Sequence, residues 1–319
     1  MPVLPPTPLQ ETTQTRFQPR FQGSICALIT PFLADDSIDF AALARLIDYQ
    51  IAGGTDALVI AGSTGESVAL ETEEFETLLS TSVEIAAKRI KIIAGTGTPS
   101  TKRSITLGKI AARADCDGVL VVTPAYCRPT QEGLFQHFSA IADASSLPIL
   151  LYNVPSRTAV DLLPETVARL SGHEKICGIK EALPEMARIT ALLQLQTQHF
   201  GVLSGDDPTA ATAIALGALG LISVAANARP ALIKALVCSA AAGNLQAAAA
   251  QSHALTPLFE ALGSEPNPIP IKWAVAHLGL CGPNIRLPLT RLSATQQPAL
   301  VQALQQTAAA SATLATLAA

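Results

Sequence analysis

The chain has 319 residues, enough for one barrel-sized domain or two ordinary domains. Apolar residues make up 49% and charged residues 14%, a balance that suits a well-filled core and argues against a disordered chain. Lys and Arg total 21 against 25 Asp and Glu, so the net charge is −4 without any basic block, and a nucleic-acid-binding surface is not expected.

The N-terminal segment, residues 1–22, differs in composition from the rest of the chain. It places prolines among Thr and Gln and contains no apolar core segment. We predict a disordered N-terminal extension here rather than a signal peptide.

The body of the chain repeats one pattern: a short apolar run, a polar or glycine-rich loop, and then an amphipathic stretch. Each run is nearly continuously apolar, as strands buried on both faces are. The runs are residues 24–30, 57–62, 91–96, 118–124, 148–154, 177–182, 200–206 and 220–227. Helices are expected between them, for example at 39–52, 72–89 and 131–144, with an acidic start at Thr72-Glu73-Glu74.

This alternation predicts a parallel sheet with right-handed crossovers. Eight such units close most economically into a (β/α)8 TIM barrel, α/β in class, at residues 23–229. A doubly wound open sheet is the alternative. From residue 230 to 319 the pattern is helical only, and we expect a C-terminal helical extension packed on the barrel.

The uncharged stretch 208–228 is long enough to raise the question of a membrane span. Most of its apolar residues are alanines, and Thr, Gly, Ser and Asn interrupt them. A buried helix followed by a buried strand explains it better, so no membrane span is expected.

Cysteine and histidine are scattered. The six cysteines form no C-x-x-C pair, and the five histidines form no metal-ligand cluster. We expect free thiols in a reducing cytoplasm and no metal site.

Barrel active sites lie where strands end, which singles out a few segments. After the second strand, residues 62–67 (GSTGES) offer backbone N–H groups and hydroxyls to an anion such as a carboxylate, although an ordinary capped turn has the same composition. The fifth strand ends at Tyr152, and Arg157 follows on a proline-stiffened loop. The pair suits a proton relay and a carboxylate clamp, or else a core tyrosine and a surface cation.

Lys180 lies in the middle of the sixth apolar run. Facing outward, it would pair with a helix. Facing the barrel mouth, its apolar surroundings would favour the neutral amine, which a Schiff-base lysine needs.

Two further strand ends carry polar residues. Tyr126 follows the fourth strand on a loop braced by prolines, able to reach a neighbouring subunit, and the adjacent Cys127 is interpreted as incidental. Asp206 and Asp207 follow the seventh strand, where metal or acid–base work and simple capping of the next helix both remain open.

Together these segments resemble the dihydrodipicolinate synthase / N-acetylneuraminate lyase family of class I aldolases over about residues 23 to 300. The resemblance rests jointly on GSTGES, TPAYCRPTQEGLFQHF, LYNVPSRT, GIKEA, SGDD, GLISVAAN and EPNPIPIKW. It implies a lyase that condenses pyruvate with aspartate 4-semialdehyde in lysine and diaminopimelate biosynthesis. It also implies a cytoplasmic homotetramer built from tight dimers, with no added cofactor.

The resemblance also assigns roles to individual residues. It makes Lys180 the Schiff-base residue and Tyr152 the proton donor and acceptor, with Ser63 and Tyr126 completing a relay and Tyr126 contributed across a dimer interface. For binding, it implies Thr64 for the pyruvate carboxylate, Arg157 for the aldehyde carboxylate, and the backbones of Gly205 and Ile222 beside the lysine.

Two departures from the family pattern stand out. The relay hydroxyl is usually threonine, and here Ser63 keeps the hydroxyl without the methyl that restrains its rotamer, so we predict an active enzyme. The side chains that bind L-lysine in sensitive relatives are histidine, asparagine, glutamate and tyrosine. They correspond to Thr72 or Phe75, Pro99, Arg103 and Ala125, and we therefore predict insensitivity to L-lysine.

Two other functions stay open. A sister aldolase acting on a sugar acid, such as N-acetylneuraminate or 2-keto-3-deoxygluconate, would keep Lys180, Tyr152 and the Ser-Thr pair, but Arg157 favours a carboxylate-bearing aldehyde. A non-catalytic binding protein on the same barrel would not need Lys180 or Tyr152, and both are present.

Overall fold

The computed structural model describes residues 21–318, and side chains as far as residue 309. The predicted N-terminal extension therefore falls almost entirely outside the described residues. Eight parallel strands form one closed barrel in chain order. They are β1 Gly23–Ala27, β2 Ala57–Ile60, β3 Lys91–Gly95, β4 Gly118–Val122, β5 Ile149–Asn153, β6 Ile176–Glu181, β7 Gly201–Ser204 and β8 Gly220–Ser223.

The (β/α)8 prediction is confirmed, and the open sheet is excluded because β1 pairs with β8 as well as with β2. The pairing of Ile25 with Ile222 closes the ring. Every predicted run overlaps one strand, and every run extends beyond that strand at the C-terminal end. Past the strand ends most residues are still apolar or have small side chains, but the backbone no longer pairs with the neighbouring strands and forms the loops of the site instead.

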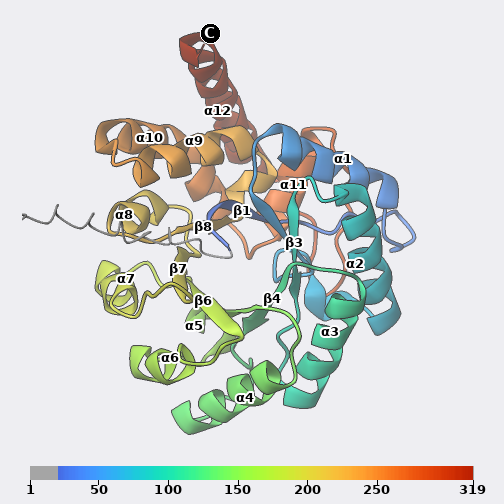
Figure 1. The fold of residues 1–319 in the computed structure, drawn as a ribbon. Coiled ribbons are helices and arrows are strands. Elements are labelled where there is room, and N and C mark those ends of the chain that lie inside the picture. The colour runs from blue at the N-terminus through green and yellow to red at the C-terminus, as the bar shows by residue number, and fades with distance from the viewer. Residues whose placement is uncertain (1–20, 319) are drawn as a thin grey trace, which may run out of the picture.

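Helices surround the barrel, as Figure 1 shows along its axis. They are α1 Phe40–Ala52, α2 Thr72–Ala86, α3 Thr101–Arg113, α4 Gln131–Asp143, α5 Pro155–Thr158, α6 Pro164–Leu170, α7 Met186–Leu193, α8 Ala210–Ala215, α9 Pro230–Ala241, α10 Leu245–Leu262, α11 Ile269–His277 and α12 Gln297–Ala318, with short 3-10 turns at η1 Ser67–Ala69 and η2 Ala225–Asn227. The uncharged stretch 208–228 contains α8 and then β8, as predicted.

Local capping explains where several helices begin. Asp39 accepts a hydrogen bond from the backbone of Ala42 at 2.9 Å, and Thr130 accepts one from Gly133 at 3.2 Å. At α2 the side chain of Glu74 reaches back to the backbone N–H of Glu71 at 3.0 Å. Each contact satisfies a backbone donor that the first helical turn leaves without a partner.

The helix that closes the outer ring is α9. It contacts β1 and β8, and it also contacts α8 and α1 on either side. The ring therefore continues beyond residue 229, where we placed the end of the barrel, because a helix must cover the seam between the last and first strands. Then α10 packs on α9 and α12, and α11 packs on α10, α12 and η2.

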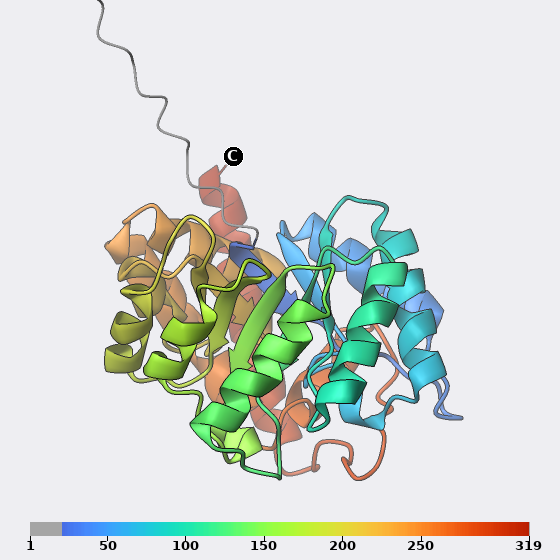
Figure 2. The ribbon, with the colours of Figure 1, turned by 60° about the horizontal axis from the view of Figure 1, so that its bottom comes forward.

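The barrel has two apolar layers. An outer core lies between the strands and the helices. An inner core fills the barrel, as side chains do in barrels of this size. It comprises Phe21, Ile25, Ala27, Ala57, Val59, Ile93, Leu120, Leu150, Tyr152, Val154, Leu203 and Ile222. Figure 2 shows the barrel from the side, with the orange-red segment between α11 and α12 crossing its lower end.

Candidate active site

Lys180 and Tyr152 lie on neighbouring strands and face the same interior. They are direct partners in the β5–β6 register, and they are only 4% and 8% exposed. The Lys180 Nζ lies 4.3 Å from the centroid of the Tyr152 ring. The lysine therefore faces the barrel interior rather than a covering helix, and a phenol lies beside its amine.

Gly205 fixes how closely the chain approaches this lysine. Its N–H donates to the Glu181 carbonyl at 2.7 Å, just past the end of β7. A Cβ at Gly205 would lie 2.7 Å from Lys180 Cε and 3.0 Å from Cγ, so a larger residue cannot fit without moving the lysine. Ile222 is fully buried in the inner core that also holds Tyr152.

The turn after β2 carries Ser63 and Thr64. Backbone hydrogen bonds from Gly65 to Gly62 at 3.0 Å and from Glu66 to Ser63 at 3.2 Å hold its shape. Thr64 is 3% exposed, whereas Ser63 is half-buried and lines a cavity of about 310 Å³ at the mouth of the barrel. Ser63 therefore lines the cavity, whereas the neighbouring Thr64 is buried.

Arg157 lies on α5, immediately after β5, and lines the same cavity. Its Nη2 donates to the main-chain carbonyl of Asn267 at 2.8 Å. The Asn267 side chain donates to the Thr64 hydroxyl at 3.0 Å. Asn267 therefore links the two predicted carboxylate-binding residues. Asn267 lies in the EPNPIPIKW segment, and no local pattern in the sequence marks it as a site residue.

Tyr126 is not brought to this site within one chain. It is 95% exposed on the loop between β4 and α4, in a left-handed backbone conformation with φ of 70°. Its neighbour Ala125 lines the cavity, so the tyrosine stands at its edge. The contribution of Tyr126 across a dimer interface stays a prediction.

The paired carboxylates after β7 have structural partners. Asp207 accepts hydrogen bonds from the Ser223 hydroxyl at 2.5 Å and from the backbone of Val224 and Ala225 at 2.9 and 3.1 Å. Asp206 accepts one from the Thr209 hydroxyl at 2.6 Å. The capping interpretation therefore fits Asp206, which bonds at the start of α8, whereas Asp207 ties the end of β7 to the turn after β8 and does not cap the next helix.

A buried ion pair below the β2 turn was missed. Lys272 of α11 contacts the Glu66 carboxylate, and these residues are 1% and 2% exposed. Glu66 also accepts the backbone N–H of Arg286 at 3.0 Å. Burial lowers the pKa of Lys272, and the nearby Glu66 charge opposes that effect. The signal was present in the sequence: Lys272, like Lys180, interrupts an apolar run.

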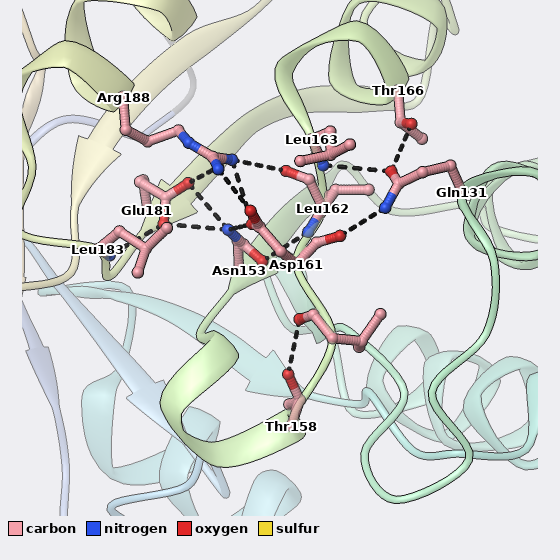
Figure 3. Close-up of polar contacts among 11 residues, drawn as sticks. Gln131, Asn153, Thr158, Asp161, Leu162, Leu163, Thr166, Glu181, Leu183 and Arg188 are labelled. Carbon is pink, nitrogen blue, oxygen red and sulfur yellow. Dashed lines mark hydrogen bonds and ion pairs between the residues drawn. The ribbon is translucent and has the colours of Figure 1, made fainter.

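A second polar cluster lies at the ends of β5 and β6, on the face of the sheet opposite Lys180. Figure 3 shows its contacts. Asn153 and Glu181, both fully buried, join β5 to β6, and Asp161 and Arg188 extend the cluster. Burial raises the pKa of Glu181 to about 7. Sequence reasoning passed over both buried residues, although each directly follows a predicted catalytic residue.

Between residues 21 and 318 no three His, Cys, Asp or Glu side chains come together in a way that could hold a metal ion. In the same part of the chain, no helix is both long and apolar enough to cross a bilayer.

The comparisons with known proteins agree with one another. The family model described as the dihydrodipicolinate synthetase family matches residues 20–307. The chain is 46% identical over 283 residues to a 4-hydroxy-tetrahydrodipicolinate synthase of Methylibium petroleiphilum, covering 89% of this chain and 97% of the relative. It is 49% identical over 277 residues to the synthase of that name from Xanthomonas axonopodis, covering 87% and 91%.

The solved structures give the same result. The chloride-inhibited dihydrodipicolinate synthase of Acinetobacter baumannii, complexed with pyruvate, matches with a TM-score of 0.88 and 43% identity, covering 89% of this chain and 98% of that one. The 4-hydroxy-tetrahydrodipicolinate synthase of Methylacidiphilum fumariolicum matches with a TM-score of 0.90 and 44% identity, covering 93% and 99%. This chain belongs to the dihydrodipicolinate synthetase family.

Proposed function

We propose that this protein is a lyase that condenses pyruvate with aspartate 4-semialdehyde to give 4-hydroxy-tetrahydrodipicolinate, in lysine and diaminopimelate biosynthesis. The observation that carries the proposal is the buried amine of Lys180, placed 4.3 Å from the Tyr152 ring inside the barrel. The names of the relatives favour this condensation over a sugar-acid aldolase. An interior lysine paired with a tyrosine favours an enzyme over a non-catalytic binding protein.

The chemistry begins at Lys180. Its neutral amine adds to the ketone carbon of pyruvate, and water leaves to give a protonated imine. The imine accepts the electron pair released when a methyl proton departs, which forms an enamine. The enamine carbon then attacks the aldehyde carbon, making the new carbon–carbon bond. Finally the substrate's own amine adds to the imine carbon, and Lys180 leaves as the ring closes.

Proton movement in this scheme is assigned to hydroxyl groups. Tyr152 takes and returns protons at the imine and enamine steps, because it lies beside the amine. Ser63 at the cavity wall and the partner subunit's Tyr126 complete the relay. Since the lysine itself supplies the electron sink, the scheme needs no added cofactor.

Carboxylate recognition is assigned to the cavity mouth. Thr64 and the N–H groups of its turn hold the pyruvate carboxylate, and the Arg157 guanidinium holds the aldehyde carboxylate. Arg157 donates to the carbonyl of Asn267. When the aldehyde substrate binds, its carboxylate replaces this neutral acceptor with a charged one. The backbones of Gly205 and Ile222 close the space around the lysine.

The assembly we propose is a homotetramer of tight dimers in the cytoplasm. Large apolar side chains stand exposed around the cavity mouth, with Val68 at 97%, Tyr126 at 95% and Leu287 at 80% exposure, which supports a covering subunit. One related solved structure is of a monomeric dihydrodipicolinate synthase variant, so the fold does not by itself require the tetramer. Sedimentation measurements with and without Tyr126→Ala test the dimer.

Reductive trapping tests the chemistry directly. The protein is incubated with pyruvate and borohydride, digested, and mapped by mass spectrometry. We expect the adduct on Lys180 and none on Lys272, a lysine that is equally buried but paired with Glu66. An adduct elsewhere, or none, would contradict the proposal.

Substrate choice needs a second assay. Pyruvate is supplied with aspartate semialdehyde or with sugar-derived aldehydes under the same conditions. We expect turnover with the semialdehyde, and we expect Arg157→Gln to raise KM for it more than KM for pyruvate. Preferential turnover of a sugar-derived aldehyde would identify the sister aldolase instead.

A further inference from the structure

Asn153 and Glu181 each follow a site residue by one position in the chain. In the β5–β6 register Tyr152 pairs with Lys180, and Asn153 pairs with Glu181. Because successive side chains on a strand point to opposite faces, the second pair lies outside the barrel, directly behind the first. Figure 3 shows the second pair with the cluster around it.

The contact between Asn153 and Glu181 is a side-chain bridge across the two strands. The Asn153 Nδ2 donates to both carboxylate oxygens, at 3.2 and 3.0 Å, and the backbone N–H of Leu183 donates to Oε1 at 2.9 Å. Both residues of the bridge are fully buried. The ends of β5 and β6 are thus tied together by side chains as well as by the backbone ladder.

The same cluster holds the returning end of the segment that carries Arg157. The Asp161 carboxylate binds Arg188 at 3.1 and 2.5 Å and accepts from Asn153 Nδ2 at 2.8 Å. The Asn153 Oδ1 accepts the N–H of Leu162 at 2.9 Å. The segment between residues 154 and 163 therefore leaves and rejoins the structure at one polar anchor.

We propose that Asn153 and Glu181 are positioning residues, which fix the placement of Tyr152 against Lys180 from behind and hold the Arg157 segment through Asp161. The inference deepens the proposed function and rests on it. Proton transfer between an amine and a phenol depends on their separation, and a shift of about 1 Å costs on the order of 100-fold in rate. A bridge one residue beyond the reacting pair limits both sliding and splaying of the two strands.

The protonation of Glu181 provides a readout that packing alone does not. The groups that face its carboxylate are donors: the Asn153 amide, the Leu183 N–H and, at 3.9 Å, the Arg188 guanidinium. Asp161, the nearby acid, is itself bound by Arg188 and Asn153. An ionised Glu181 offers both oxygens to these donors, whereas protonation places a hydrogen on one of those accepting oxygens. With a pKa raised by burial to about 7, the bridge tightens as pH rises through neutrality.

The test compares Glu181→Gln with Ile179→Ala. Ile179 is a fully buried residue on the same outer face of β6, paired with Leu151 rather than Asn153, so its loss removes packing but not the bridge. We expect Glu181→Gln to lower kcat about 10- to 100-fold and to abolish a rise in kcat around pH 7. We expect Ile179→Ala to lower Tm at least as much, yet to keep that pH dependence and most of kcat.

A second variant covers the case in which Glu181→Gln does not fold. Arg188→Gln removes the ion pair that holds Asp161, and it leaves the hydrogen bond from Asn153 to Asp161 and the Asn153–Glu181 bridge in place. We expect it to raise KM for aspartate semialdehyde several-fold while kcat changes little, because the Arg157 segment loosens and the hydrogen bonds of the bridge remain.

Two results would overturn the inference. One is an equal fall in kcat for Glu181→Gln and Ile179→Ala, with the pH profile unchanged. The other is a crystal structure of Glu181→Gln that keeps Lys180 Nζ at its wild-type distance from the Tyr152 ring. Failure of the proposed function would look different: the wild-type protein would give no pyruvate adduct on Lys180, whatever the variant structures show.

Discussion

Lys180 Nζ lies 4.3 Å from the centroid of the Tyr152 ring, and the two residues are direct partners in the β5–β6 register. This relationship comes from the backbone ladder, so it does not depend on a mobile loop. It places an amine and a phenol together in a buried interior, where proton exchange needs little rearrangement.

Tyr152→Phe removes the phenol hydroxyl but keeps the ring against the lysine. We expect kcat to fall about 100- to 10,000-fold, the usual contribution of a positioned acid–base group. Pyruvate should still be trapped on Lys180, only more slowly. Steady-state kinetics combined with timed borohydride quenching measure both effects, and a wild-type kcat in the variant would exclude Tyr152 from the relay.

Gly205→Ala places a methyl group 2.7 Å from Lys180 Cε. The lysine must move, so we expect the rate of Schiff-base formation to fall at least about 10-fold. Gly108→Ala is the matched control, because nothing lies within 4 Å of a Cβ there. That change lies within α3 and should leave kcat unaltered and raise stability by about 1 kcal/mol. Equal kinetics for the two alanine variants would show that Gly205 does not constrain the lysine.

Ser63→Thr tests the first departure from the family pattern. Because Ser63 keeps its hydroxyl at the cavity wall, we expect the wild-type protein to be active and the threonine variant to differ by only a few-fold. The two kcat values are compared at saturating pyruvate. A near-inactive wild type whose activity returns in Ser63→Thr would show that the methyl group is required.

L-Lysine is expected not to inhibit this protein. Thr72, Phe75, Pro99 and Arg103 line one cavity of about 250 Å³. By the resemblance, Arg103 occupies the position of the acidic side chain that accepts the lysine ammonium. Its guanidinium repels the ammonium group of lysine. Rates measured across a millimolar range of L-lysine should not change, and strong inhibition in that range would refute the prediction.

Lys272→Met isolates the Glu66 carboxylate in the core. Removing one partner of a buried ion pair costs about 3–5 kcal/mol, because the other charge loses its compensation. Glu66→Gln combined with Lys272→Met removes both charges, and we expect it to recover much of the free energy of unfolding. Denaturant midpoints of the wild type, the single variants and the double variant complete the cycle. A double variant no more stable than Lys272→Met would mean that the pair is not coupled.

The sequence by itself determined the strands, the order of strand and helix, and the strand ends at which polar residues gather. Each of these depends on neighbours a few residues away, such as the apolar run that contains Lys180 or the acidic start of α2 at Thr72. Periodicity and capping are local properties, and they can be read without knowing where the chain goes next.

The tertiary structure alone decided which distant side chains meet. Because β1 pairs with β8, the C-terminal ends of all eight strands surround one opening of the barrel. It also brought Lys272 to Glu66, 206 residues earlier, and Asn267 to Thr64, 203 residues earlier. No local pattern encodes such contacts, because they arise only when the backbone has closed and two buried polar groups need partners. The proposed role of Tyr126 depends on a second subunit, so the fold of one chain does not determine it.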